Sequence, residues 1–588
     1  MKYIFFITLV VCSLFCSGQI LNFSNFHTPA QVDAALTQLQ TTYPTKARVV
    51  TIGNSLGGLP IKALKISSNP LVNDPAKGDV VFVAEHHARE WISVEVALYL
   101  ADQLLARYST DMALQADMDN LQIYIVPTVN PDGYQYTQTP ANRMWRKNRR
   151  NNGDGTFGVD LNRNWGYQWG LSSGSSSTTS DDTYRGTAAF SEPETVVIRD
   201  FLNGMTNLKS FVSYHSYSEL YLRPWSYTTS DPPGETTLRS IVQRNIGRIA
   251  SVHGHTYTEE IWYTSSGEAT DYVWQEKRVA AFTPELRPSS GAGGGFAPPP
   301  GEIIPCAEEN FPAARALIHD AARTGIWIKD SPGDTGAEPS TGAFWISPDI
   351  WTDPVDLVAG STVDLHIRVR NNTGVSQSNV TVDAYFTDPR IALEFPSATS
   401  VLIGTRTITV PAAGTEIVMP WTVPSGRNSW GELHWCVGVV LKHADDMPLT
   451  TVINRTSNIA CKNFETREVI SGAILTLAAT NFLSTAAELQ VTNGNFKLPP
   501  GFRYEVLEKE IKREKAPGAG TLRKGKLLKS TGILLEPGES IQIPIRISFD
   551  GNLPDNSEFS LQGNIIPLVA GKREVISNGY TYSLKSRQ

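Results

Sequence analysis

The sequence predicts an α/β domain in the first half of the chain and β-sandwich domains in the second half. In the first half, the continuously apolar run 80–84 is typical of a strand that is covered on both faces. The next segment, 91–108, has apolar residues at helical spacing and no internal Gly or Pro. In the second half, short alternating runs such as 362–369 and 434–441 are separated by turn residues. Runs of this second kind indicate immunoglobulin-like sandwiches.

Three side chains are predicted to bind one zinc ion. His87 and Glu90 lie between the strand at 80–84 and the helix that follows it. The i, i+3 step points an imidazole and a carboxylate at one place, and the positive end of the helix favours the anionic ligand. Another apolar strand ends at His215, and with only ten histidines in the chain few alternatives compete for the third position. Zinc takes nitrogen and oxygen ligands, and three protein ligands plus water make a catalytic site.

A zinc hydrolase also needs a base for the attacking water and positive charge for the developing oxyanion. Glu285 closes a third apolar run, where a carboxylate needs a partner such as a metal site. Arginines are dense at 142–150 and 160–165. Such clusters are commonly solvated faces, but the interleaved Trp145 and Trp165 favour a half-buried cleft.

Five motifs resemble those of zinc metallocarboxypeptidases of the pancreatic carboxypeptidase A and B type. The match covers residues 24–326, and five separated motifs in the family's order are far more specific than any one of them. The resemblance implies a mixed, mostly parallel central sheet with helices on both faces. It also implies hydrolysis of the C-terminal peptide bond of peptides and proteins by a zinc-activated water. The motifs are His-x-x-Glu at 87–90, Asn-Arg-x-Trp-Arg-Lys at 142–147, Asp-x-Asn-Arg-Asn-Trp at 160–165, Ser-x-His-Ser-Tyr-Ser at 213–218 and Glu-Leu-Arg at 285–287.

The resemblance implies a role for each motif residue. Glu285 is expected to act as the general base, and Arg146 to polarise the scissile carbonyl and stabilise the oxyanion. Asn162 and Arg163 are expected to clamp the substrate's terminal carboxylate, a task that suits a planar guanidinium. Arg143 is expected to make a second contact with the terminal carboxylate, and Arg89 and Tyr217 to form an outer subsite. Asp160 is expected to orient the first zinc histidine. Tyr263 is expected to act as a mobile lid.

The terminal side chain of the substrate is expected to meet Thr270, which is neither the aliphatic floor of the A-type nor the acidic floor of the B-type. Glu268 lies two positions earlier, and the stretch 266–271 resembles bacterial broad-specificity members. We therefore predict that hydrophobic terminal residues are accepted and that basic ones are accepted through Glu268. In the alternative interpretation, Glu268 points to solvent.

A chain of 588 residues is expected to hold two to four domains. Its first residues, a lysine and then an apolar run ending in Ser17 and Gly18, are typical of a secretory signal peptide and predict export to the extracellular space or periplasm. Cys16 leaves a lipoprotein as the alternative, and no later stretch is apolar enough to predict a membrane span. The predicted parts are a signal peptide at 1–18, a catalytic domain at 19–329, a linker at 330–342, an immunoglobulin-like sandwich at 343–464 and a second β-rich domain at 465–588.

Net charge and cysteine content bear on the partners and on disulfide bonding. A net charge of −7 gives no reason to expect nucleic acid as a partner. Beyond the signal segment only Cys306, Cys436 and Cys461 remain, which is not a disulfide framework, although the last two are able to pair. The sandwich domains are expected to bind a surface or a partner. Two alternatives stay open: the same chemistry on cell-wall or modified peptides, and an inactive binding or adhesion protein with the same fold.

Overall fold

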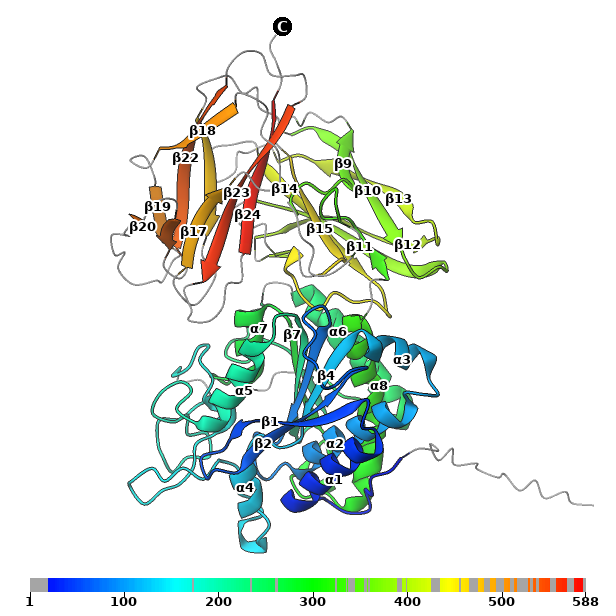
Figure 1. The fold of residues 1–588 in the computed structure, drawn as a ribbon, viewed down its shortest axis with the longest axis vertical. Helices are drawn as coiled ribbons and strands as arrows, with labels where there is room; N and C mark the ends of the chain where they lie inside the picture. The colour runs from blue at the N-terminus through cyan, green and yellow to red at the C-terminus, as the bar shows by residue number, and fades with distance from the viewer. Residues whose placement is uncertain are drawn as a thin grey trace, which may run out of the picture.

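The computed structural model shows an α/β region followed by four β-sheets that lie beyond one end of it (Figure 1). Up to residue 464 it describes most of the chain, and from 474 to 584 it describes the strands and a few residues beside them. The undescribed stretches are 1–18, 172–173, 233–234, 260–262, 323–324, 335, 337–343, 354–356, 358–359, 389–393, 398, 425–433, 454–455, 465–473, 481–486, 493–501, 508–511, 516–526, 529–531, 536–538, 550–556, 568–575 and 585–588. The predicted signal peptide and much of the predicted linker therefore lie outside the described residues.

Seven described strands form the central sheet, in the order β1-β2-β4-β3-β5-β7-β6. The pairings among β4, β3, β5 and β7 are parallel, and those toward the two edges are antiparallel. The predicted mixed sheet is confirmed, but it is not mostly parallel: three pairings at the centre are parallel and three toward the edges are antiparallel. The strands are β1 (Ala47–Asn54), β2 (Pro60–Ile66), β3 (Gly78–Ala84), β4 (Leu121–Val126), β5 (Leu208–Ser216), β6 (Leu220–Leu222) and β7 (Ala280–Leu286).

Helices cover both faces of this sheet, as predicted (Figure 1). All seven residues of β3 are buried, and they alternate between two cores. Val80 and Phe82 pack with the core on the side of α1, α2 and α8, and Val81 and Val83 with the core on the side of α5. The helices are α1 (Pro29–Thr42), α2 (Trp91–Arg107), α3 (Met112–Asp119), α4 (Pro131–Tyr136), α5 (Pro193–Gly204), α6 (Glu235–His253), α7 (Ala269–Lys277) and α8 (Ile303–Ala322), with short 3₁₀ helices η1 (Pro140–Asn142), η2 (Leu161–Arg163), η3 (Gly291–Gly293) and η4 (Pro300–Glu302).

Two four-stranded sheets then face each other across one apolar core, as in the predicted first sandwich. One sheet has the order β13-β10-β8 with β9 beside β10, and the other has the order β12-β11-β14-β15. Along β10 buried residues alternate with more exposed ones, which is why its sequence carries the period-2 pattern. The strands are β8 (Ile326–Trp327), β9 (Ile350–Asp353), β10 (Thr362–Asn371), β11 (Gln377–Thr387), β12 (Val401–Val410), β13 (Thr415–Thr422), β14 (Trp435–Lys442) and β15 (Ile459–Phe464).

Further strands form two more sheets near the C-terminus. One has the order β16-β22-β18 with β19 beside β22, and the other has the order β20-β21-β17-β23-β24. In the described part of the chain, none of the helices has the length and apolar character that crossing a bilayer requires. Cys306, Cys436 and Cys461 are buried thiols without a disulfide bond. The strands are β16 (Ile474–Thr480), β17 (Ala487–Thr492), β18 (Phe502–Val506), β19 (Lys512–Lys515), β20 (Leu527–Leu528), β21 (Gly532–Leu535), β22 (Glu539–Phe549), β23 (Ser557–Pro567) and β24 (Ile576–Leu584).

Candidate active site

Three side chains that could hold a metal ion meet at the carboxyl edge of the parallel strands. His87 lies just after β3, Glu90 immediately precedes α2, and His215 lies near the end of β5, the parallel neighbour of β3. One ligand atom from each of the three lies within 4.8 Å of the others, and all three residues are buried. The predicted group of ligands is therefore brought together.

The hydrogen bonds around this group fit a bound cation. The Nδ1 atoms of His87 and His215 face each other at 3.1 Å and lie 2.8 and 3.0 Å from the two carboxylate oxygens of Glu90. The opposite ring nitrogens have other partners, since Nε2 of His87 lies 3.0 Å from Asp160 and Nε2 of His215 lies 3.0 Å from Oγ of Ser213. If each Nε2 carries the proton, two nitrogen lone pairs and a carboxylate converge, which is the donor set that zinc prefers.

Asp160 connects the first histidine to an arginine. Arg146 donates from Nε and Nη2 to Oδ2 of Asp160, at 3.0 and 2.8 Å, while its Nη1 lies 3.7 Å from Glu90. Burial disfavours the charge of Asp160, but Arg146 and His87 outweigh burial and hold the pKa of Asp160 well below its ordinary value. Asp160 is therefore an anion that fixes both the imidazole and the guanidinium beside the metal group.

Glu285 lies on β7, directly opposite His215 of β5 in the parallel register. Burial and the carboxylate of Glu90 raise the pKa of Glu285 well above its ordinary value, while Arg146 lowers it. A carboxyl group whose protonated form is this accessible is suited to taking up a proton and giving it back. Glu285 also lines the cleft beside the metal group.

The predicted carboxylate clamp is held by the short helix η2. Oδ1 of Asn162 accepts a hydrogen bond from the N–H of Ala269 at 3.0 Å. The guanidinium of Arg163 donates to the carbonyls of Gly174 and Asn162, both at 2.7 Å, and to Oε1 of Glu268 at 3.0 Å. Glu268 is buried, so the alternative in which it points to solvent is not what the structure shows. The clamp arginine and the predicted specificity residue form an ion pair.

A cavity of about 380 Å³ runs from the metal group past this ion pair. Its wall also includes Leu222, Trp225 and Thr283, so it offers apolar surface beside the charged groups. Thr270 is buried and does not line this cavity; its hydroxyl lies 3.4 Å from that of Thr283, which does. Of the predicted site residues, those that line the cavity are His87, Glu90, Arg146, Asn162, Arg163, Tyr217, Tyr263, Glu268 and Glu285.

The rim of the cavity contains the predicted lid and the outer subsite. The side chain of Tyr263 is 64% exposed, as a lid residue that is free to move requires. Arg89 and Tyr217 both contact Phe296: the guanidinium lies 4.1 Å from its ring centroid, and the two aromatic centroids are 4.7 Å apart. Arg143 donates to the carbonyl of Phe296 at 2.6 Å.

Phe296 lines the cavity and is a site residue that sequence reasoning missed. It is the single aromatic residue in the glycine- and proline-rich segment 288–301. The sequence did contain a signal for Phe296: it is a large aromatic side chain in a segment of turn-forming residues. An aromatic ring in a surface loop usually packs against another group or a ligand.

Comparison with known proteins gives a consistent result. The zinc carboxypeptidase family matches residues 32–313. Zinc carboxypeptidase A 1 of Anopheles gambiae is 33% identical over 312 residues, which are 52% of this chain and 70% of that protein. Carboxypeptidase B of Astacus astacus is 32% identical over 308 residues, 51% of this chain and 98% of that protein. Among solved structures, carboxypeptidase A from Helicoverpa armigera has 32% identity and a TM-score of 0.46, over 51% of this chain and 75% of that one.

The buried histidine–carboxylate group at the carboxyl edge of the parallel strands fits the donor set of a metal-dependent hydrolase. The chain belongs to the zinc carboxypeptidase family, and it is a metallocarboxypeptidase that uses one zinc ion. The predicted family, enzyme class and cofactor are confirmed.

Proposed function

We propose that this protein is a secreted enzyme that removes the C-terminal residue from peptides and proteins. His87, Glu90 and His215 hold the zinc ion, which supplies a Lewis acid for the scissile carbonyl and lowers the pKa of a coordinated water. The observation that carries this proposal is the convergence of the three ligands, two of which, His87 and Glu90, line the same cavity as Arg163. A site that binds a fixed anion next to the reacting bond suits an exopeptidase, because an endopeptidase gains nothing from such a contact.

Three side chains perform the remaining chemistry in this proposal. Glu285 accepts the proton of the attacking water and then donates it to the leaving amine. Arg146, held beside Glu90 by Asp160, stabilises the negative charge that develops on the carbonyl oxygen. Asp160 also orients His87 through the hydrogen bond to its Nε2.

Peptides with free and amidated C-termini test the exopeptidase assignment. Because Arg163 and Asn162 bind the terminal carboxylate in this proposal, the amidated peptide should be cleaved at least about 100-fold less efficiently, as expected when a buried charge pair loses one partner. Arg163→Ala should lower kcat/KM for the free acid by a similar factor and remove most of the discrimination. Arg48→Ala, at an exposed position of β1, is the matched control and should change neither value. Equal cleavage of both peptides by the unaltered enzyme would contradict the assignment.

We further propose that the cavity accepts hydrophobic terminal residues on its apolar wall and basic ones beside Glu268. Glu268→Ala should lower kcat/KM for a peptide ending in Lys at least about tenfold more than for peptides ending in Phe or Leu, since a charge-assisted contact is lost only with Lys. The ratio between the peptides is the decisive measurement. If Glu268 only supports Arg163, all substrates, including one ending in Asp, will change by the same factor, and the preference for Lys over Asp will remain.

Export and domain organisation complete the proposal. Residues 1–18 direct the chain out of the cytoplasm, the catalytic residues lie in the part that ends at residue 329, and the sandwich domains that begin at residue 343 bind a surface or partner. The motif composition of the N-terminus supports the first point. Sequencing the N-terminus of the exported protein tests it, since retention of residues 1–18 would rule out a cleaved signal.

A further inference from the structure

A loop of the first sandwich contributes to the core of the catalytic region. Residues 443–451, which we name the docking loop, connect β14 toward β15. Met447 and Leu449 from this loop are 5% exposed and belong to the same apolar cluster as residues of α2, α6 and α8. Two large side chains of one domain are thus buried in the core of the other.

The docking loop also makes polar contacts at the start of β7. The N–H of Ala280, the first residue of that strand, donates to the carbonyl of Leu449 at 2.6 Å. Strand β6 pairs with β7 only from Thr283 to Glu285, so within the described chain the beginning of β7 has the docking loop, rather than β6, on that edge. The Thr450 hydroxyl donates to the carbonyl of Arg278, and Arg278 forms an ion pair of 2.8 Å with Glu394 of the sandwich. The loop therefore covers the beginning of β7, an edge of the central sheet that would otherwise be open.

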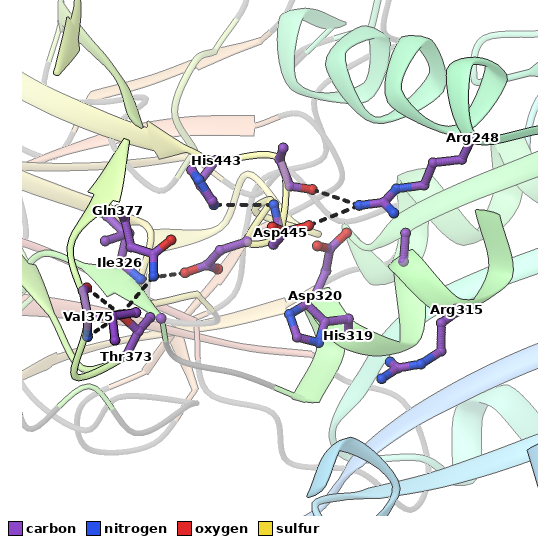
Figure 2. Close-up of a pocket in the computed structure, with 14 residues that line it drawn as sticks. Arg248, Arg315, His319, Asp320, Ile326, Thr373, Val375, Gln377, His443 and Asp445 are labelled. Carbon is purple, nitrogen blue, oxygen red and sulfur yellow. Dashed lines mark hydrogen bonds and ion pairs between the residues drawn. The ribbon is translucent and has the colours of Figure 1, made fainter. Parts of the chain in front are cut away.

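Charged groups surround the apolar contact. The N–H of Met447 donates to Asp320 of α8 at 3.2 Å, and Asp320 pairs with Arg244 of α6 at 2.7 Å. Figure 2 shows Arg248 directed at Asp445 across the junction. The two side chains form an ion pair of 3.0 Å beside a cavity of about 450 Å³ that both regions line.

The catalytic region gives a segment to the sandwich in return. β8 pairs with β10, with Trp327 opposite Arg370 and Ile326 opposite Asn371. Ile326 and Ile328 are fully or almost fully buried in the sandwich core. Each region therefore lacks part of its own core without the other.

From this reciprocal exchange we infer that the catalytic region and the first sandwich are one obligate unit, and that the docking loop positions β7 and so the carboxylate of Glu285. The sandwich is then a component of the enzyme rather than a detachable accessory. Leu449 is a positioning residue in this proposal, since its buried side chain anchors the docking loop and its main-chain carbonyl accepts the hydrogen bond from Ala280. The assembly does not depend on the proposed substrate, but the positioning role rests on the proposed base.

The test cuts the folded chain between the two regions. A specific protease site is inserted between residues 337 and 343, the full-length protein is cleaved after folding, and the products are separated by size-exclusion chromatography. We expect the two pieces to co-elute and to keep their activity. The cleaved Met447→Asp/Leu449→Asp protein should separate and lose at least about tenfold in kcat. The matched control is Val418→Asp, on an exposed position of β13, which should co-elute. Separation of the unaltered pieces with full activity in the catalytic piece would overturn the inference.

A milder variant keeps the test decisive if the double variant does not fold. In the uncut chain, Leu449→Ala should lower kcat about threefold to tenfold with KM and zinc content unchanged, and Leu449→Met should restore it. A loop that serves stability alone would leave kcat per bound zinc at the level of the unaltered enzyme, and that result would refute the positioning role. Because the chromatographic readout does not involve catalysis, it remains informative even if the assignment of Glu285 is wrong.

Discussion

Replacing Glu285 with Gln is expected to lower kcat by about 10³-fold or more while one zinc ion stays bound. The magnitude follows from the loss of a group that both accepts and donates the reacting proton, since general acid–base catalysis alone contributes about 10²- to 10⁴-fold. Gln has nearly the same shape as Glu but cannot take up a proton, so the change removes the chemistry and keeps the packing. Steady-state kinetics and metal analysis on the same sample measure both quantities.

The control for this change is Glu276→Gln on α7, which removes a carboxylate outside the cavity. It should leave kcat within about twofold of the unaltered enzyme. If Glu285→Gln keeps more than a tenth of the original kcat, another group must activate the water. If it loses its zinc as well, then Glu285 helps to hold the metal and the division between base and ligands is incorrect.

Removing the zinc ion should abolish activity and also destabilise the fold. A ligand present at about 1,000 times its Kd stabilises the folded state by about 4 kcal/mol, so a strong chelator should remove at least that much. His87, His215 and Glu90 lie 2.8 to 3.1 Å from one another and come from different segments, so zinc binding by this group is coupled to folding. Thermal unfolding with and without chelator measures the loss, and added zinc should restore both activity and stability.

His215→Ala separates a specific metal effect from a general effect of the chelator. This variant should bind little zinc, show no measurable turnover, and unfold at a temperature that the chelator no longer changes. By contrast His253→Ala, on the exposed end of α6, should respond to the chelator like the unaltered enzyme. A zinc-dependent activity that survives in His215→Ala would mean that the third ligand lies elsewhere.

Much of the metal site could be predicted from the sequence because its signals are local. His87 and Glu90 follow the apolar run 80–84, and His215 lies near the end of β5, the parallel neighbour of β3. Because the carboxyl ends of parallel strands meet at one edge, these side chains were expected to lie close together, and they do. The bounds of α2, Trp91–Arg107, agree with the predicted 91–108 for the same reason, since an uninterrupted helical pattern defines its own length.

The features that escaped prediction depend on contacts between distant segments. Nothing near Glu268 in the chain indicates that Arg163 will be its partner. Arg163 lies in η2 and Glu268 immediately precedes α7, and these distant segments meet only in the folded domain. Met447 and Leu449 follow the predicted β run 434–441, and an apolar residue there is equally compatible with the core of its own sandwich. The apolar character of these side chains predicts that they are buried, but it does not predict which domain they pack against.

The ion pair between Arg163 and Glu268 has a consequence for what the cleft retains. In the proposed function Arg163 receives the substrate's carboxylate, so an arriving carboxylate would have to compete with Glu268, which already pairs with this arginine. A small anion that makes no other contact with the cleft gains little by replacing Glu268 as the partner of Arg163, so it should bind weakly. By the same reasoning we expect the released amino acid, which keeps the carboxylate but has lost the contacts of the rest of the peptide, to inhibit the enzyme only weakly.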